Sequence, residues 1–179
     1  MTQLQKPADI LEVRALTRDR TKGNLRFGQI TVPCALGRSG ILARKKEGDS
    51  GTPSGRFELL QVYYRPDKGL PPATSLPLEP LTPVSGWCDD PRHRLYNRPV
   101  RLPFASGHER MWRQDRLYDI VVVLDCNMYP AVKGRGSAIF FHIAREDYRP
   151  TEGCVAVAPE HMRLLLAKIR PGAVMQIHI

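Results

Sequence analysis

The clearest structural signal in the sequence is the stretch Tyr118-Asp119-Ile120-Val121-Val122-Val123-Leu124-Asp125-Cys126. β-Branched residues favour an extended backbone, and Asn127 and Pro130 bound the apolar run, so this stretch is predicted to be a β-strand. No stretch of the chain approaches the roughly 18 consecutive apolar residues of a membrane span. A membrane-spanning segment is therefore not expected.

Further strands and one helix are expected on both sides of this stretch. The helix is predicted because apolar residues recur at helical spacing between Pro159 and the stop signal Pro171-Gly172. The predicted elements are a hairpin of strands 10–16 and 26–34 with its turn at Lys22-Gly23-Asn24, strands 56–64 and 137–144, a helix over 159–170 and a strand over 173–179.

Length and composition indicate the fold class. A chain of 179 residues is the size of one domain, and 14 glycines and 16 prolines argue against a helical bundle. We expect a mainly β fold with one helix near the C-terminus and long irregular loops. The expected organisation is a single domain over residues 1–179, with a long basic loop over about 65–117.

The net charge of +9 is concentrated in part of that loop. Arginines interleaved with aromatic residues such as Trp112 are also typical of a nucleic-acid surface. The alternative is a solvated loop whose arginines pair locally. The arginines of this stretch are Arg92, Arg94, Arg98, Arg101, Arg110, Arg113 and Arg116.

Two residues suggest nucleophilic chemistry. Cys154 follows Gly153, and a thiol becomes a useful nucleophile when a base such as His142 can take its proton. The glycine would allow a tight turn that directs backbone N–H groups at a developing oxyanion. The residues alone also allow a small core cysteine and a structural histidine.

A resemblance to a known family favours the catalytic interpretation. Thr151-Glu152-Gly153-Cys154-Val155 resembles the Ser/Thr-x-Gly-Cys-apolar nucleophile motif of the YkuD-type L,D-transpeptidases, and Thr52-Pro53-Ser54-Gly55-Arg56-Phe57 is similar to their Thr-Pro-x-Gly-x-Phe segment. His142 stands where those enzymes keep their base. The resemblance spans about residues 26–179.

The resemblance implies a mixed β-sandwich-like catalytic fold and a thioester mechanism without a cofactor. Cys154 would be the nucleophile and His142 the base. The N–H groups of Cys154 and Gly153 would form the oxyanion hole, and Thr151 would shape the turn. The implied partners are peptidoglycan stem peptides rather than nucleic acid, with an acyl group passed to the side-chain amine of diaminopimelate on another stem.

The sequence departs from the family pattern beside the nucleophile. Ile143 follows the base where Gly or Ser is usual, Glu152 stands where His is common, and Ala156 replaces Arg or Asn. These changes suggest an altered donor site, so a link such as 1→3 is expected as an alternative to 3→3.

The other candidate substrate-binding residues have a structural alternative. Arg135 and Ser137 could bind a stem carboxylate or close a turn, and Trp112 could cap the cleft or anchor a loop. His108 is a further candidate cleft residue, whereas Cys34, Cys88 and Cys126 are expected to be buried bystanders. No metal site is expected, because His142 and Glu146 give H-x-x-x-E rather than H-E-x-x-H.

Several alternatives remain at this point. Water could resolve the thioester, giving an L,D-carboxypeptidase or endopeptidase, or the domain could be a non-catalytic basic module that binds wall polymer or nucleic acid. The resemblance implies the periplasm or cell envelope, but the first 20 residues show no secretory apolar region, so a cytoplasmic location is also considered. The sequence does not indicate an oligomeric state.

Overall fold

The computed structural model describes residues 9–179, so residues 1–8 of the predicted domain lie outside the described part. The predicted mainly β class is confirmed: the described residues form fourteen strands and one helix, α1 (Pro159–Leu166). The strands of the large sheet are β1 (Ile10–Ala15), β2 (Lys22–Phe27), β3 (Ile30–Ala35), β6 (Gly55–Tyr64), β7 (Leu78–Pro80), β11 (Ile120–Leu124), β12 (Phe140–Ile143), β13 (Val155–Val157) and β14 (Val174–His178).

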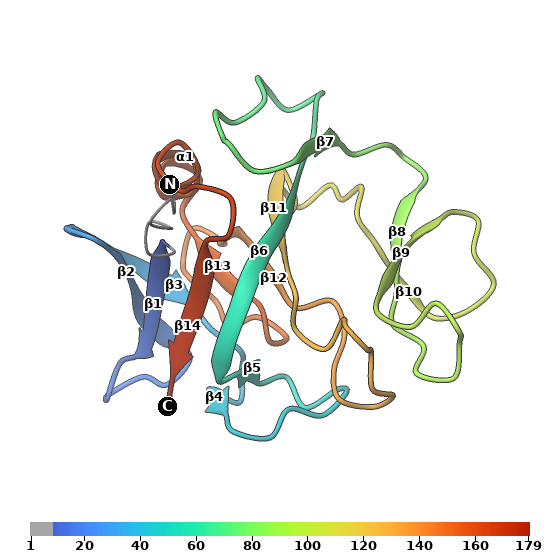
Figure 1. Ribbon diagram of the computed structural model, residues 1–179, viewed down its shortest axis with the longest axis horizontal. Helices are drawn as coiled ribbons and strands as arrows, with labels where there is room; N and C mark the ends of the chain where they lie inside the picture. The colour runs from blue at the N-terminus through green and yellow to red at the C-terminus, as the bar shows by residue number, and fades with distance from the viewer. Residues whose placement is uncertain (1–8) are drawn as a thin grey trace, which may run out of the picture.

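The large sheet closes on itself. Its order is β11-β12-β13-β3-β2-β1-β14-β6-β7, and β11 pairs with β6 as well as with β12. Most neighbours are antiparallel, but three pairs are parallel: β12 with β13, β1 with β14, and β6 with β7. Figure 1 shows β6 and β14 running side by side across the front of the molecule.

The predicted run 118–126 is the centre of this arrangement. All five residues of β11 are buried, because the strand has a paired neighbour on each side and side chains packed on both faces. Val122 belongs to the main core with Phe141 and Met162, whereas Val121 and Val123 face a second cluster that contains Phe140 and Cys154. The nucleophile candidate thus lies on the opposite face of the sheet from the main core.

The first predicted hairpin is wrong in its pairing. Lys22-Gly23-Asn24 begins β2 instead of forming the turn, and β2 pairs with both β1 and β3. The turn between β2 and β3 lies at Gly28, whose φ of +58° suits glycine. Gly23 is required by packing, because a Cβ there would approach the carbonyl oxygen of Arg14 to 2.5 Å.

The helix is confirmed but shorter than the predicted 159–170. Pro159 occupies its first turn, where no backbone N–H is needed, and Met162, Leu165 and Leu166 are fully buried. The chain leaves helical geometry after Leu166, and Ile169 still reaches the core from the turn that follows.

The segment 65–117 is less irregular than expected. Besides β7 it contains a small antiparallel sheet with the order β10-β8-β9, formed by β8 (Ser85–Cys88), β9 (Arg98–Arg101) and β10 (His108–Arg110). Figure 1 shows this sheet beside the large one. Trp87 anchors it: its ring meets Phe140 edge-on at 5.1 Å, and its indole N–H donates to Asn97 Oδ1 at 3.0 Å.

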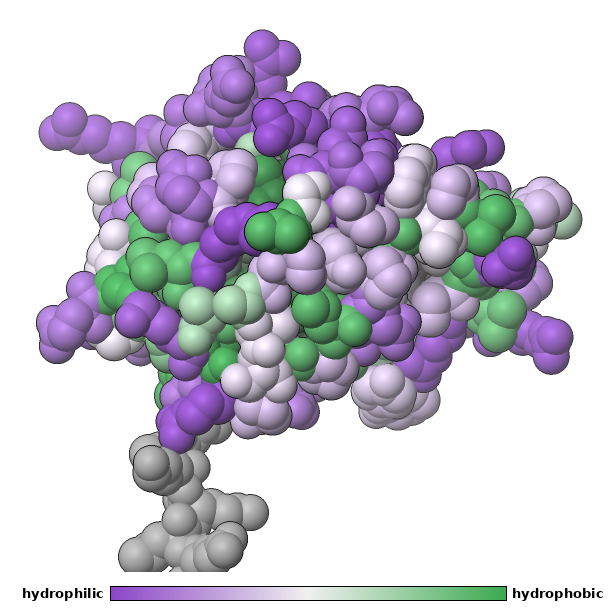
Figure 2. Space-filling model, turned by 90° about the horizontal axis from the view of Figure 1, so that it is seen from above, coloured by the Kyte–Doolittle hydropathy of each residue, from purple (hydrophilic) through white to green (hydrophobic). Residues whose placement is uncertain are grey.

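A glycine-rich loop and a short parallel pair complete the described chain. β4 (Ile41–Leu42) pairs with β5 (Thr52–Pro53), and residues 43–51 form the loop between them. Figure 2 shows hydrophobic side chains as separate small patches among hydrophilic ones on the face it presents. Within residues 9–179, no helix has both the length and the apolar character needed to cross a membrane.

Candidate active site

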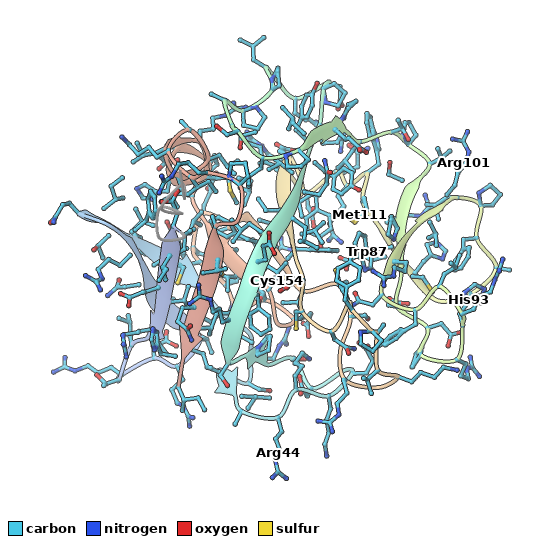
Figure 3. All side chains as sticks on the ribbon, in the orientation of Figure 1. Arg44, Trp87, His93, Arg101, Met111 and Cys154 are labelled. Carbon is cyan, nitrogen blue, oxygen red and sulfur yellow. The ribbon has the colours of Figure 1, made fainter. Side chains whose placement is uncertain are left out.

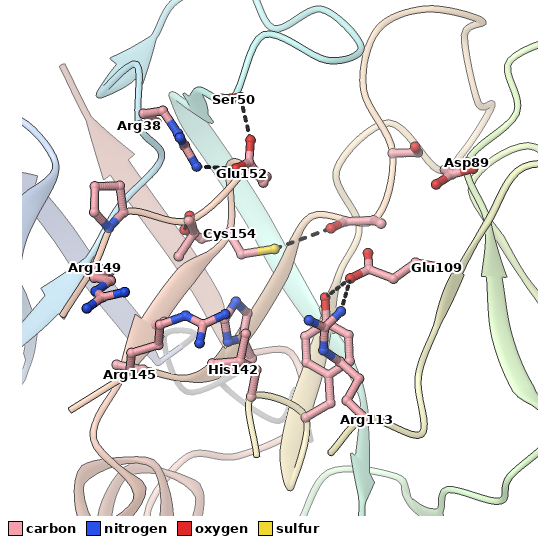
Figure 4. A pocket seen from close by; sticks show the side chains of 18 of the residues that line it. Arg38, Ser50, Asp89, Glu109, Arg113, His142, Arg145, Arg149, Glu152 and Cys154 are labelled. Carbon is pink, nitrogen blue, oxygen red and sulfur yellow. Dashed lines mark hydrogen bonds and ion pairs between the residues drawn. The ribbon is translucent and has the colours of Figure 1, made fainter. Parts of the chain in front are cut away.

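Two neighbouring strands bring the candidate nucleophile and base together. β12 carries His142 and pairs parallel with β13, in a register that sets His142 opposite Ala156. Cys154 directly precedes β13, and His142 and Cys154 both line a cavity of about 730 Å³ (Figure 4). The motif residues that are twelve positions apart in sequence therefore share one site.

Thr151 holds the turn that carries the nucleophile. Its hydroxyl donates to the carbonyl oxygen of Cys154 at 2.6 Å and accepts the N–H of Gly153 at 3.1 Å. The backbone of Thr151 is itself fixed on both sides, since its N–H donates to Leu36 O and its carbonyl accepts from Arg38 N–H, each at 2.9 Å. The Gly153 N–H is thus already bonded, in contrast to the expectation that it would contact an oxyanion.

Gly153 is the residue that this turn requires. Its φ is +135°, a conformation that residues with a side chain rarely adopt. An added Cβ would also lie 2.8 Å from the carbonyl oxygen of Gly51 and 3.2 Å from Ile139 Cδ1. The motif glycine therefore packs the nucleophile turn directly against the glycine-rich loop.

The thiol of Cys154 is held by backbone groups. Its Sγ donates to the carbonyl oxygen of Ala138 and accepts the N–H of Phe140, both at 3.3 Å. Ala138 adopts a φ of +52°, and such strain in a residue other than glycine is typical of functional sites. Burial raises the pKa of Cys154 to about 12, with the Glu109 carboxylate as the next contribution.

Position, rather than acidity, distinguishes this cysteine from the others. Burial also raises the pKa of Cys34 and of Cys126 to about 12. All four cysteines of the described region are reduced and buried, but Cys154 is the one that lines the cavity.

His142 is oriented as a base. Its Nδ1 lies 2.8 Å from the carbonyl oxygen of Ile143, so Nδ1 carries the hydrogen and Nε2 carries the free lone pair. Burial lowers the pKa of His142 to about 4. The ring of Tyr118 packs edge-on against the imidazole at 5.3 Å. At neutral pH the resting site therefore holds a neutral thiol and a neutral imidazole.

The walls of the cavity carry opposite charges. Figure 4 shows Arg38, Arg145 and Arg149 on one side of the nucleophile and Asp89 and Glu109 on the other. The motif residue Glu152 lies at the basic side, where it accepts hydrogen bonds from Arg38 at 2.6 Å and from Ser50 at 2.5 Å.

The substrate-binding candidates separate into two groups. Thr151, Glu152 and Ser137 line the cavity, although the Ser137 hydroxyl is bonded to Glu47 at 2.9 Å. Arg135 is exposed outside the lining and closes a turn through its N–H to Val132 O, which matches its structural alternative.

His108 and Trp112 also lie outside the cavity lining. His108 bonds the carbonyl oxygen of Ser106 at 2.8 Å and packs near Phe104. Trp112 lies beneath the Arg65 guanidinium, whose carbon is 3.8 Å from the ring centroid, so this tryptophan anchors a loop. The structure therefore places neither residue in the cavity that Cys154 lines, and their contact with substrate stays a prediction.

Most arginines of the arginine-rich stretch lie outside the cavity lining. Of its seven arginines, Arg113 lines the cavity, whereas Arg92 pairs with Asp90 and Arg116 with Asp119. Figure 3 shows Arg101 and His93 far from Cys154, at the edge of the small sheet. The solvated-loop alternative describes most of this stretch.

Several cavity residues had no signal in the sequence. Glu109 and Asp89 come from the small sheet and the loop beside it, and Arg145 and Arg149 follow β12. They are ordinary charged residues in ordinary contexts, so the fold alone identifies them. Within residues 9–179, no group of three His, Cys, Asp or Glu residues is arranged to hold a metal ion.

The chain is similar to a known protein family and to a solved structure. Residues 16–179 match the family model described as YkuD, the L,D-transpeptidase catalytic domain. Among solved structures, L,D-transpeptidase 1 of Mycobacterium tuberculosis is similar at 12% sequence identity and a TM-score of 0.37, over 94% of this chain and 62% of that one. No curated protein matches.

Proposed function

Because the chain belongs to the YkuD family of L,D-transpeptidase catalytic domains, we propose that it cross-links peptidoglycan through a thioester on Cys154. The acyl donor is a stem peptide, and the acceptor is the side-chain amine of diaminopimelate on another stem. The observation that carries the proposal is the meeting of Cys154 and His142 on adjacent strands in one cavity.

Acylation begins with transfer of the thiol proton to His142 Nε2. Nδ1 stays bonded to the carbonyl oxygen of Ile143, which fixes the ring and stabilises the imidazolium that forms. The thiolate attacks the carbonyl carbon of an L-residue, and the protonated His142 gives its proton to the departing amine of the following residue. A C–S bond replaces the C–N bond.

The oxyanion of the tetrahedral intermediate needs a donor beside the sulfur. Gly153 N–H is bonded to Thr151, so the N–H of Cys154 itself is the proposed donor. The Thr151 hydroxyl bonds the carbonyl oxygen of Cys154 and the N–H of Gly153, so it holds the backbone on both sides of the peptide that carries this N–H.

The charge of the proposed substrate also supports the proposal that the domain binds peptidoglycan stem peptides. A stem peptide carries carboxylates, and the arginine side of the cavity offers Arg38, Arg145 and Arg149 as partners for them. A volume of about 730 Å³ is within the range of pockets that take small ligands or peptide segments. We propose that the domain acts at the cell envelope, where its polymer substrate is located.

The linkage is a separate part of the proposal. Ala156 lines the cavity at the place where the family pattern has a longer polar residue, so that polar side chain is missing beside the nucleophile. We propose that this site accepts either the usual donor of 3→3 links or a donor such as L-alanine at stem position 1.

Intact-protein mass spectrometry with purified muropeptides tests the reaction. The wild type should gain a stem-peptide adduct on Cys154 and release a cross-linked dimer, and the Cys154→Ala variant should do neither. Cys126→Ala is the matched control, because that thiol is buried outside the cavity, and it should behave as the wild type. No adduct and no new muropeptide from the wild type would defeat the proposal.

Fragmentation of the dimer identifies the link. A bond from diaminopimelate to diaminopimelate indicates 3→3, and a bond from L-alanine to diaminopimelate indicates 1→3. Release of free D-residues without any dimer would instead assign a carboxypeptidase.

A further inference from the structure

Glu109 is the cavity group that acylation does not use. It lies on β10, in the small sheet, and faces the nucleophile across the cavity (Figure 4). Its negative charge contributes to raising the pKa of Cys154, so it opposes formation of the thiolate. A carboxylate in this position does not assist the first half of the reaction.

The hydrogen bonds of Glu109 leave one oxygen available. Tyr118 OH donates to Oε1 at 2.5 Å, and Arg113 Nη1 donates to the same oxygen at 3.3 Å. Within residues 9–179, Oε2 has no hydrogen-bond donor. The side chain keeps 27% of its surface exposed and lines the cavity, so a bound molecule can reach this oxygen.

The neighbours of Glu109 hold it beside the reacting groups. The Tyr118 ring packs against both His142 and Phe140, with centroids 5.3 and 5.8 Å apart. Arg113 is in turn fixed by Asp115 at 2.6 Å. Burial raises the pKa of Glu109, against the hydrogen bond from Tyr118 and the charge of Arg113, which makes the carboxylate a better proton acceptor than an exposed one.

Other cavity carboxylates are less suited to bind a cation. Glu47 accepts hydrogen bonds from Tyr96 and from Ser137 on the same oxygen, and its neighbour in the loop is Lys45. Glu152 is paired with Arg38 on the basic side. Asp89 lies on the same side of the cavity (Figure 4), but Glu109 is the carboxylate that accepts a hydrogen bond from Tyr118, whose ring packs against His142. Glu109 thus combines a free oxygen, a position opposite those arginines and a link through Tyr118 to the base.

We infer that Glu109 binds the acceptor amine as its ammonium ion and removes the proton that the nitrogen must lose before it attacks the thioester. This inference rests on the proposed function and assigns a residue to its second half. The cation neutralises Glu109, so an occupied acceptor site also ends the repulsion between this carboxylate and the departing thiolate.

Aminolysis removes two protons from the acceptor nitrogen, and Glu109 and His142 accept one each. The nitrogen enters with three protons as an ammonium ion and ends with one proton as an amide, so it loses two protons. One passes to Glu109 and then to solvent. The other leaves the tetrahedral intermediate for His142, which gives it to the Cys154 thiolate as the C–S bond breaks and the new C–N bond remains.

The test is the ratio of cross-linked to hydrolysed product from the acyl-enzyme. Muropeptide donor is supplied with and without a diaminopimelate-containing acceptor, and acylation is followed separately by intact mass. In Glu109→Gln, the ratio should fall about tenfold or more, because the charged partner of the ammonium is lost, while acylation is no slower. Gln keeps an amide oxygen that can accept from Tyr118.

Glu79→Gln is the matched control, since Glu79 is an exposed carboxylate on β7 outside the cavity, and its ratio should equal that of the wild type. Glu109→Asp, which keeps the charge on a shorter side chain, should lie between Glu109→Gln and the wild type. If Glu109→Gln does not fold, a lowered ratio in Glu109→Asp supports the inference and an unchanged one overturns it.

An unchanged ratio in Glu109→Gln overturns the inference and leaves the proposed function intact. Acylation and transfer that fall together, at a constant ratio, would assign Glu109 a structural role and also overturn it. Absence of any acyl-enzyme in the wild type defeats the proposed function itself.

Discussion

The most direct test of the nucleophile turn is Thr151→Val. Valine keeps the shape of threonine, but it can neither donate to Cys154 O nor accept from Gly153 N–H, the two bonds of 2.6 and 3.1 Å that Thr151 Oγ1 makes. Each neutral hydrogen bond contributes about 0.5 to 1.5 kcal/mol, so the free energy of unfolding should fall by roughly 1 to 3 kcal/mol. Thr151 is half-buried, so water can form hydrogen bonds with part of the groups that lose their partner. The lower half of the range, about 1 to 2 kcal/mol, is therefore expected.

Thermal unfolding measures the first part of this prediction. For a domain of this size, each kcal/mol shifts the Tm by about 2 to 4 °C, so a loss of about 1 to 2 kcal/mol in Thr151→Val should lower it by roughly 2 to 8 °C. Thr151→Ser keeps the hydroxyl and should stay within about 0.5 kcal/mol of the wild type. The rate of Cys154 acylation should fall about tenfold in Thr151→Val, because the backbone on both sides of the Gly153–Cys154 peptide loses the bonds that hold it.

Two results would refute this reasoning. One is a Thr151→Val protein with wild-type Tm and acylation rate, which would mean that the backbone bonds to Leu36 and Arg38 are sufficient to hold the turn. The other is a Thr151→Ser protein as impaired as Thr151→Val, which would assign the effect to the lost methyl group.

Three further predictions concern the same site. The pKa of His142 falls from 6.5 to about 4 on folding, so the native state binds fewer protons than the unfolded state between these pH values. The free energy of unfolding should therefore decrease by roughly 3 kcal/mol as the pH falls from about 6.5 to about 4. Urea unfolding at several pH values checks this, and an equal pH dependence of the free energy of unfolding in the wild type and His142→Asn would contradict it. Gly153→Ala should destabilise the fold by about 1 to 3 kcal/mol and abolish rapid acylation, because the positive φ and the approach to Gly51 O both oppose a Cβ; a stable, fully active variant would show that the turn adapts. Arg38→Ala should change the free energy of unfolding by less than about 1 kcal/mol, because its pair with Glu152 is exposed, with side-chain exposures of 67% and 71%; a larger loss in denaturant titration would indicate a structural role.

Sequence patterns predicted the elements that are long and apolar. β11, β12 and β14 lie within the predicted strands, and β6 begins one residue before its predicted strand, because buried β-branched runs have few alternatives to an extended backbone. The helix was found from its spacing and from Pro159. The hairpin near the N-terminus was misplaced because Gly23, taken for a turn residue, is a strand residue whose missing Cβ makes room for Arg14 O.

The small sheet could not be predicted in the same way. β8, β9 and β10 have three or four residues each and contain Gly, Pro and Arg, so no apolar alternation marks them. Their positions depend on a tertiary contact, the packing of Trp87 on Phe140.

The site was predicted in part. The motif containing Cys154 and the base His142 are recognisable because the residues stand at fixed places in a short pattern. Glu109 reaches the cavity through the small sheet, and Arg145 and Arg149 through the loop after β12, so neither side of the charged cavity follows from local sequence. A charged residue acquires its role here only from the fold that surrounds it.

The position of β14 has a consequence for how this domain is made. β14 lies between β1 and β6, so a strand that the ribosome makes after the other thirteen described strands completes the pairing of two strands made much earlier. Until it arrives, β1 and β6 present open edges, which are prone to pair with other chains. Pairings so distant in sequence also close slowly. Nascent chains of this domain should therefore depend on chaperones until β14 has left the ribosome.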